Sequence, residues 1–131
     1  MGAFDFTLTS QPETFTRLQR HFNFILDTVF APHNYNTYVN LLKTDGTMIL
    51  VGVPDKPTPL EPFPLILHRR RIAGSVIGGI RETQEILDFC ATHNIESDIE
   101  VIPIQQVNEA YERVLRGDVT FRFVIDLTSL K

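Results

Sequence analysis

The chain has 131 residues, 43% of them hydrophobic and 21% charged, with a formal net charge of −4. Such a length suits one domain, residues 1–131, with a buried core. An acidic balance does not indicate a nucleic-acid partner. The one basic run, Arg69 to Arg71, is interpreted as a solvated entry to a strand rather than a phosphate site.

The single cysteine, Cys90, excludes both an internal disulfide framework and a thiolate zinc cluster. This usage is typical of a reducing cytoplasm, which is the location that we expect. Residues 1–9 lack the basic and apolar regions of a signal peptide. No apolar run approaches the ~20 residues that cross a bilayer, so no membrane partner is expected.

The first residues predict a short strand over Phe6–Thr9. The spacing of Ser10 and Glu13 matches a capping box, which predicts a helix that begins here and ends near Arg20.

Two apolar runs, Phe24–Val29 and Thr47–Val53, do not alternate with polar residues. This pattern indicates parallel strands that are buried on both faces. Between them we expect a helix that Asn34 caps and that ends at Gly46 in a left-handed turn.

Closely spaced prolines after the second run predict a stiff surface connection without regular structure. These are Pro54, Pro57, Pro59, Pro62 and Pro64.

A third strand is predicted over Arg71–Val76. The pair Gly78-Gly79 ends it, and a helix over Ile80–His93 follows, with Asn94 as its stop.

The C-terminal residues predict a strand over Ile99–Ile102, a helix over Val107–Leu115 closed by Gly117, and a last strand over Phe121–Leu127. The alternation of strands and helices predicts an α/β fold with a mainly parallel sheet.

Ligands of open parallel sheets bind beyond the carboxyl ends of the strands. Three such ends are predicted, at residues 27–29, 51–54 and 74–79. Their glycines either let a ligand approach the main chain or only form turns. The third segment follows a strand and opens a helix, as a phosphate cradle would, yet it lacks the Gly-x-Gly-x-x-Gly pattern.

None of the histidine, serine and cysteine residues considered next is predicted to be a catalytic group or a metal ligand. His21, His33, His68 and His93 do not form a metal-binding pattern and are interpreted as surface or loop residues. Ser75 has no base nearby in the sequence, and Cys90 is interpreted as a core residue.

Several segments, in order over nearly the whole chain, resemble zinc-dependent medium-chain alcohol dehydrogenases of the cinnamyl alcohol dehydrogenase type. They are Phe24–Val29, Asp45–Pro54, Ile72–Gly79, Glu82–Phe89, Asn108–Arg113 and Arg122–Asp126. The similarity covers only the latter part of that family's sequence.

The resemblance implies NADP-dependent interconversion of alcohols and aldehydes with a catalytic zinc. It also implies that the zinc ligands, the structural zinc lobe and the glycine-rich turn lie upstream, outside this chain. The residues that it implies for the nicotinamide side of the cofactor are Thr28, Val29, Gly52, Val53, Ser75, Val76 and Arg122. Thr120 stands where the family commonly has another arginine, so no contact is assigned to it.

By this resemblance the chain is the second half of a Rossmann-like cofactor domain, an incomplete doubly wound sheet plus a C-terminal strand. Strands 1 and 2 of the order 3-2-1-4-5-6 would be absent. The resemblance implies a homodimer through the outer strand, Ile72–Val76. Because strand 4 would lack a neighbour, we expect Phe6–Thr9 to shift beside Phe24–Val29.

Two functional hypotheses follow. In the first, the chain is part of a dehydrogenase, has little or no activity alone, and binds NADP weakly or not at all. In the second, it is a non-catalytic pairing module derived from that family. Zinc-ligand motifs directly upstream in the gene would favour the first hypothesis.

Overall fold

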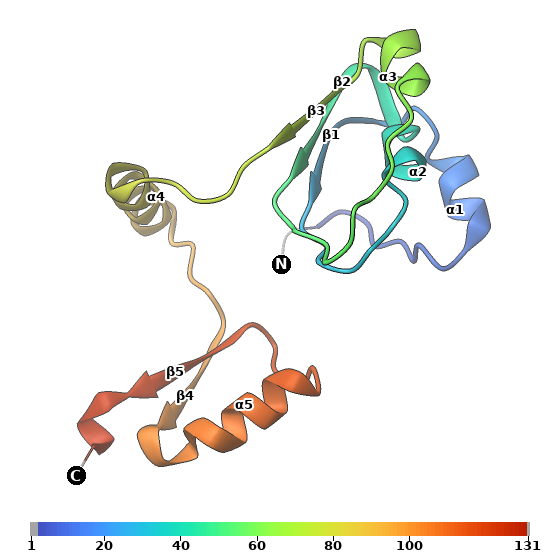
Figure 1. The fold of residues 1–131 in the computed structure, drawn as a ribbon. Coiled ribbons are helices and arrows are strands. Elements are labelled where there is room, and N and C mark those ends of the chain that lie inside the picture. The colour runs from blue at the N-terminus through green and yellow to red at the C-terminus, as the bar shows by residue number, and fades with distance from the viewer. Residues whose placement is uncertain (1–2, 131) are drawn as a thin grey trace. The chain divides into compact units, whose positions relative to one another are not determined.

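The computed structural model describes residues 3–130 and divides them into two compact units (Figure 1). The first unit runs to Ile77 and the second starts at Gly78.

The first unit contains a three-stranded parallel sheet with helices between its strands. Its elements are α1 (Pro12–Arg17), β1 (Phe22–Asp27), α2 (Tyr35–Val39), β2 (Leu42–Leu50), α3 (Phe63–His68) and β3 (Arg71–Gly74). The strand order is β1-β2-β3, and both pairings are parallel. This arrangement confirms the predicted α/β class with parallel strands.

One face of this sheet carries the core. Val39 of α2 and Leu42 and Met48 of β2 are fully buried, and α2 and α3 lie on this face (Figure 1). Arg70 ties the same layer together, because its guanidinium donates to the Leu42 carbonyl at 2.6 Å and to Asn40 Oδ1 at 3.2 Å. Burial of these side chains supplies the main stabilisation of the unit.

The opposite face of β1 is open. Phe24 and Leu26 are 57% and 55% exposed, whereas Ile25 packs against the core. The prediction that Phe24–Val29 is buried on both faces was therefore wrong for this structure. The apolar residues of β1 suit a strand that is covered on both faces, whereas the helices of this unit cover only one face.

The segment Phe6–Thr9 is not a strand, which corrects the sequence prediction. Its backbone is bound to α1 instead, since the Leu8 carbonyl accepts from Thr14 Oγ1 at 3.0 Å and from the Gln11 amide at 3.4 Å. A hollow of about 620 Å³ is lined by this segment, α1 and β1. The predicted shift of Phe6–Thr9 beside Phe24–Val29 was therefore wrong, and β1 is an edge of the described sheet.

The start of α1 also differs from the prediction. Gln11 is its N-cap and makes no side-chain capping bond, so the capping box of Ser10 and Glu13 was wrong. Pro12 occupies the first turn, where its missing N–H leaves no helix bond unmade.

The segment predicted as one helix from Asn34 to Gly46 instead holds α2 and the first residues of β2. Asn34 caps α2 as predicted, because its side chain accepts from the Asn36 amide at 3.0 Å. The left-handed position is Asp45, with φ of 63°, rather than Gly46. A short aspartate tolerates this conformation. The strand register shifts here, from the pair Phe22–Leu42 to the pair Phe24–Thr47.

Helix α3 lies where the sequence predicted no regular structure. Pro62 is its N-cap and Pro64 lies in its first turn, so neither interrupts a helical hydrogen bond. The helix ends at Arg69, which has φ of 50°.

The second unit contains α4 (Ile80–His93), β4 (Ile99–Pro103), η1 (Ile104–Gln106), α5 (Val107–Leu115), β5 (Arg122–Asp126) and η2 (Leu127–Ser129). Strands β4 and β5 pair in parallel. Asn94 and Gly117 end their helices in left-handed conformations, with φ of 52° and 71°, as the sequence predicted.

Arg113 of α5 connects this helix to the two-stranded sheet. Its guanidinium contacts Glu100 of β4 at 2.6 and 2.9 Å and Asp118 at 3.1 Å. It also lies 4.7 Å from the ring centre of Phe123 on β5. These contacts are the principal polar links between α5 and the sheet.

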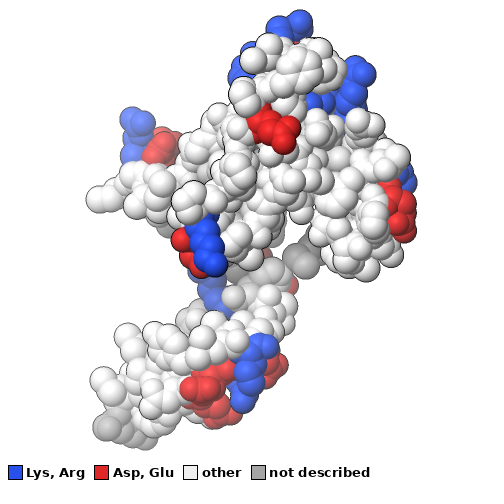
Figure 2. All heavy atoms as spheres, turned by 45° about the vertical axis from the view of Figure 1, so that its right-hand side comes forward, with Lys and Arg blue, Asp and Glu red and all other residues white. Residues whose placement is uncertain are grey.

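Charged side chains occur in separate small groups on the face shown in Figure 2, with uncharged surface between them. No helix within residues 3–130 is long and apolar enough to cross a membrane.

Candidate functional site

The carboxyl ends of β1, β2 and β3 lie at one edge of the sheet, since Asp27 pairs with Leu50 and Leu50 with Gly74. The Asp27 carbonyl accepts from the amides of Val51 at 2.9 Å and Gly52 at 3.2 Å. The Ser75 amide donates to the Leu50 carbonyl at 3.0 Å. The predicted strand ends therefore meet at a single edge.

Gly52 brings two of these segments into contact. A Cβ on residue 52 would lie 2.8 Å from the Thr28 carbonyl carbon and 2.7 Å from that of Val29. Only glycine leaves room for the main chain at this point. The sequence left open whether Gly52 lets a ligand approach or only forms a turn, and in the structure the chain's own backbone approaches it.

The other predicted residues lie on the exposed surface beside this contact. Val53 is 74% exposed and Val76 is 87% exposed. Ser75 and Val76 follow the last residue of β3, so they belong to the loop rather than to the strand.

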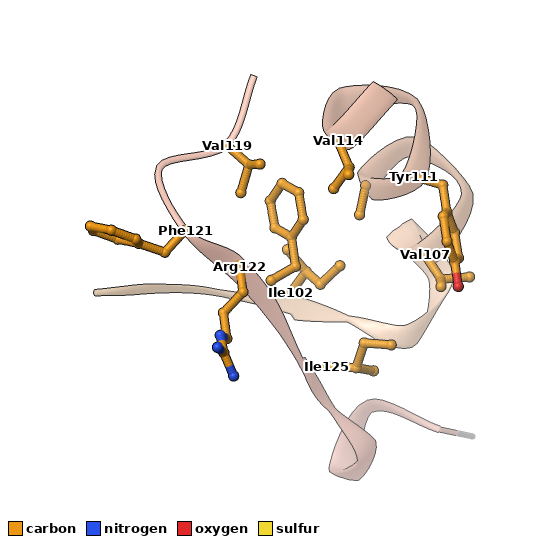
Figure 3. A pocket seen from close by; sticks show the side chains of 10 residues that line it. Ile102, Val107, Tyr111, Val114, Val119, Phe121, Arg122 and Ile125 are labelled. Atoms are coloured by element: carbon orange, nitrogen blue, oxygen red, sulfur yellow. The ribbon is translucent and has the colours of Figure 1, made fainter. Parts of the chain in front are cut away.

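Arg122 belongs to the second unit. It is the first residue of β5 and pairs with Ile99. It borders an apolar pocket of about 290 Å³ between β5 and α5, and its side chain points away from Tyr111 and Val114 (Figure 3).

The glycine-rich segment before α4 does not present a free phosphate cradle. The Glu82 carboxylate accepts from the Gly79 amide at 2.7 Å. A carboxylate of the chain itself therefore occupies the start of the helix, where a phosphate would otherwise bind.

A buried pair at the end of β1 was missed from the sequence. Asp27 is 8% exposed, and its Oδ2 lies 2.7 Å from His33 Nε2. Its Oδ1 accepts from the Val29 amide at 3.0 Å. His33 is in a loop, as predicted, but its side chain is 14% exposed and is not a surface group. The sequence signal was an aspartate that ends an apolar strand, six residues before a histidine.

Opposing effects act on the pKa of His33. Burial, the largest single effect, lowers it. The hydrogen bonds to the Ala31 carbonyl and to Asp27, together with the attraction of the Asp27 charge, outweigh burial and raise it. The resulting pKa lies above the ordinary value of 6.5. The site thus places a histidine of raised pKa against a buried carboxyl group beside the strand ends.

The described side chains form no donor set for a metal ion. Within residues 3–130, no group of three or more histidine, cysteine, aspartate or glutamate side chains is placed to hold a metal ion. Cys90 is a half-buried free thiol. These residues do not fit a zinc site.

Comparison with known proteins identifies the class. Residues 3–92 match the family described as zinc-binding dehydrogenase, so the chain belongs to this family. It is 62% identical over 113 residues, 85% of the chain, to aldehyde reductase YahK of Escherichia coli (strain K12). It is 50% identical over all 131 residues to NADP-dependent alcohol dehydrogenase C 1 of Mycolicibacterium smegmatis.

A solved cinnamyl alcohol dehydrogenase, SbCAD4 from Sorghum bicolor, superposes on 95% of the chain with a TM-score of 0.85 and 36% identity. The match confirms the Rossmann-like cofactor-domain fold. The chain spans 32% and 38% of the two relatives and 35% of this structure. It corresponds to their C-terminal part.

Proposed function

We propose that this chain is the C-terminal part of an NADP-dependent alcohol dehydrogenase or aldehyde reductase and supplies the nicotinamide side of its cofactor site. The observation that carries the proposal is the shared strand edge, where Gly52 packs against the main chain of Thr28 and Val29. The relatives named for NADP-dependent or aldehyde-reducing activity support the same assignment. In this proposal residues 1–131 act as one partial cofactor domain.

The main chain at this edge would orient the cofactor. Amide and carbonyl groups at Thr28, Val29, Gly52, Val53, Ser75 and Val76 would contact the nicotinamide, its carboxamide and its ribose. Arg122 would approach the cofactor from the closing strand. When bound, NADP supplies the hydride exchange with the substrate carbon.

Zinc enters this proposal only through the rest of the protein, because the described side chains do not fit a metal site. The glycine-rich pyrophosphate turn would likewise come from the part of the relatives that this chain does not span. We therefore propose that the chain alone has little or no activity.

A pairing module is the alternative function. Strand β3 is bonded to β2 on one side, and its other side is an edge of the described sheet. This open edge, continued by Ser75 and Val76, could pair with a second copy through Ile72–Val76. A homodimer is compatible with both functions.

A chimera tests the proposal. The N-terminal part of the Escherichia coli aldehyde reductase is joined to this chain, which replaces its matching C-terminal segment. We expect the chimera to reduce aldehydes with NADPH. A folded chimera, judged by circular dichroism and light scattering, that neither binds NADPH nor reduces an aldehyde would contradict the proposal.

A further inference from the structure

The loop that leaves β1 folds back onto the end of the strand through His33. Its Nε2 lies 2.7 Å from Asp27 Oδ2, and its Nδ1 lies 2.8 Å from the Ala31 carbonyl oxygen. The residues between them include Thr28 and Val29. Both nitrogens of this imidazole ring therefore hold the loop, one through Asp27 at the end of β1 and the other through Ala31.

Both partners of the ring are acceptors. A carbonyl oxygen only accepts hydrogen bonds, and an ionised carboxylate does the same. With Asp27 ionised, the two short contacts together require a proton on each ring nitrogen, which is the pattern of an imidazolium. A neutral ring would turn a lone pair toward one of the two oxygens.

Asp27 transmits this closure to the predicted cofactor edge. Its Oδ1 holds the Val29 amide at 3.0 Å, and its main-chain oxygen holds the amides of Val51 and Gly52. One buried residue thus fixes both segments that meet at Gly52. A change at His33 would reach both segments through Asp27, by its side chain at Val29 and by its main chain at Val51 and Gly52.

Few other titratable groups face the ring. On α2, the rings of Tyr35 and Tyr38 contact it edge-on at 4.9 and 5.4 Å between centres. On the facing proline loop, Glu61 lines the same hollow as His33, with a volume of about 470 Å³. Asp27 is the group that is hydrogen-bonded to the ring.

We propose that His33, acting through Asp27, is a positioning residue that holds the main chain of Thr28 and Val29 in the cofactor-binding geometry only while its ring is doubly protonated. This inference rests on the proposed function for its link to NADP. Deprotonation removes one of the ring's two donors and so loosens the loop, and cofactor affinity therefore falls as the pH rises. His33 itself does not touch the cofactor in this account.

The proposed role of His33 is tested first without any cofactor. Nuclear magnetic resonance of the ¹⁵N-labelled 131-residue chain follows the imidazole nitrogens and the amides of Val29 and Gly52 between about pH 5 and pH 9. We expect two protonated nitrogens on His33 at neutral pH. The two amides should shift with the same midpoint as the ring. A single neutral tautomer of His33 at neutral pH would overturn the proposed role of this residue.

Variants separate positioning from titration. His33→Gln keeps a side-chain N–H that can donate to Asp27 but cannot titrate, so the Val29 amide should stay near its neutral-pH position and lose its pH dependence. His33→Phe keeps the ring and removes the donors, so that amide should move at every pH. His93→Gln is the control, because His93 is bonded to Phe89 within α4. An unchanged Val29 midpoint in His33→Gln contradicts the proposal.

The link to function is tested in the chimera with NADP as the probe. We expect affinity to fall about tenfold as His33 deprotonates, the loss of one charge-assisted hydrogen bond, and to become independent of this step in His33→Gln. If the affinity for NADP changes neither with pH nor in His33→Gln, the positioning role is contradicted. Absence of NADP binding at every pH, with the amide titration intact, contradicts the proposed function instead.

Discussion

Gly52 lies against the main chain of Val29 so closely that a Cβ on residue 52 would be 2.7 Å from the Val29 carbonyl carbon. The neighbour is main chain rather than the end of a flexible side chain, so it cannot rotate away. The contact joins the ends of β1 and β2 at the edge where we place the nicotinamide.

Gly52→Ala should therefore destabilise the first unit by about 2 kcal/mol, since overpacking against fixed atoms costs roughly 1–3 kcal/mol. Urea unfolding followed by circular dichroism measures the change. Gly74→Ala is the matched control, because its Cβ would meet only the Leu50 carbonyl at 3.9 Å, an ordinary contact. Equal stability of the two variants would show that the Gly52 contact is not tight.

The stabilisation from two particular contacts, one in each unit, should change with pH in opposite directions. His33 has a raised pKa, so its stabilisation is full below the ordinary histidine value and is lost as the pH rises through the folded-state pKa. Glu100 has a pKa lowered mainly by its hydrogen bond with Arg113, so its stabilisation is present above the ordinary value and is lost as the pH falls.

Amide hydrogen exchange, followed separately for each unit, measures these two pH dependences. Protection of β4 and β5 should decline in acid, and Glu100→Gln should reduce that decline. Glu85→Gln is the control in the same unit, since Glu85 and Arg81 are both exposed and 3.4 Å apart. The account of Glu100 fails if the two variants show the same acid profile.

The isolated chain should not oxidise benzyl or cinnamyl alcohol with NADP in a zinc-dependent manner. Its described side chains do not fit a metal site, and a glutamate caps the glycine-rich start of α4. We expect NADP to bind more weakly than about 1 mM, which is a binding free energy of less than about 4 kcal/mol. Calorimetry measures the affinity. Micromolar binding, or turnover that a chelator abolishes, would contradict this prediction.

Pairing through β3 predicts a homodimer that a proline can break. The Ser75 amide points to β2, so in a parallel ladder the Gly74 amide points to the open edge. Gly74→Pro removes that outward donor, and light scattering should then give a monomer. Gly74→Ala keeps the donor and should remain dimeric. A wild-type chain that stays monomeric at ~10 times the assay concentration would contradict the dimer.

Local signals predicted much of this fold. Asn34, Asn94 and Gly117 bound their helices as expected, because capping depends on neighbours a few residues away. Phe6–Thr9 was mispredicted because a strand needs a partner that local pattern cannot supply. Pro64 was read as a breaker, although proline suits a first helical turn.

The site was predictable to a similar extent. The three strand ends meet as a parallel sheet requires. The pair of Asp27 and His33 was missed because it depends on how the loop closes, and sequence spacing does not determine that. For Gly52 the sequence offered ligand approach or a turn as alternatives, and it gave no signal for the contact with the main chain of Val29.

The most direct test of the central claim is amide mapping on the ¹⁵N-labelled chimera with two ligands. NADP carries a nicotinamide, whereas adenosine 2′,5′-bisphosphate carries only the adenine side. We predict that NADP shifts the amides of Thr28, Val29, Gly52 and Ser75 and that the bisphosphate, at equal occupancy, leaves them in place. The same shifts with both ligands, or bound NADP that leaves these amides unmoved, would contradict the assignment of this edge to the nicotinamide.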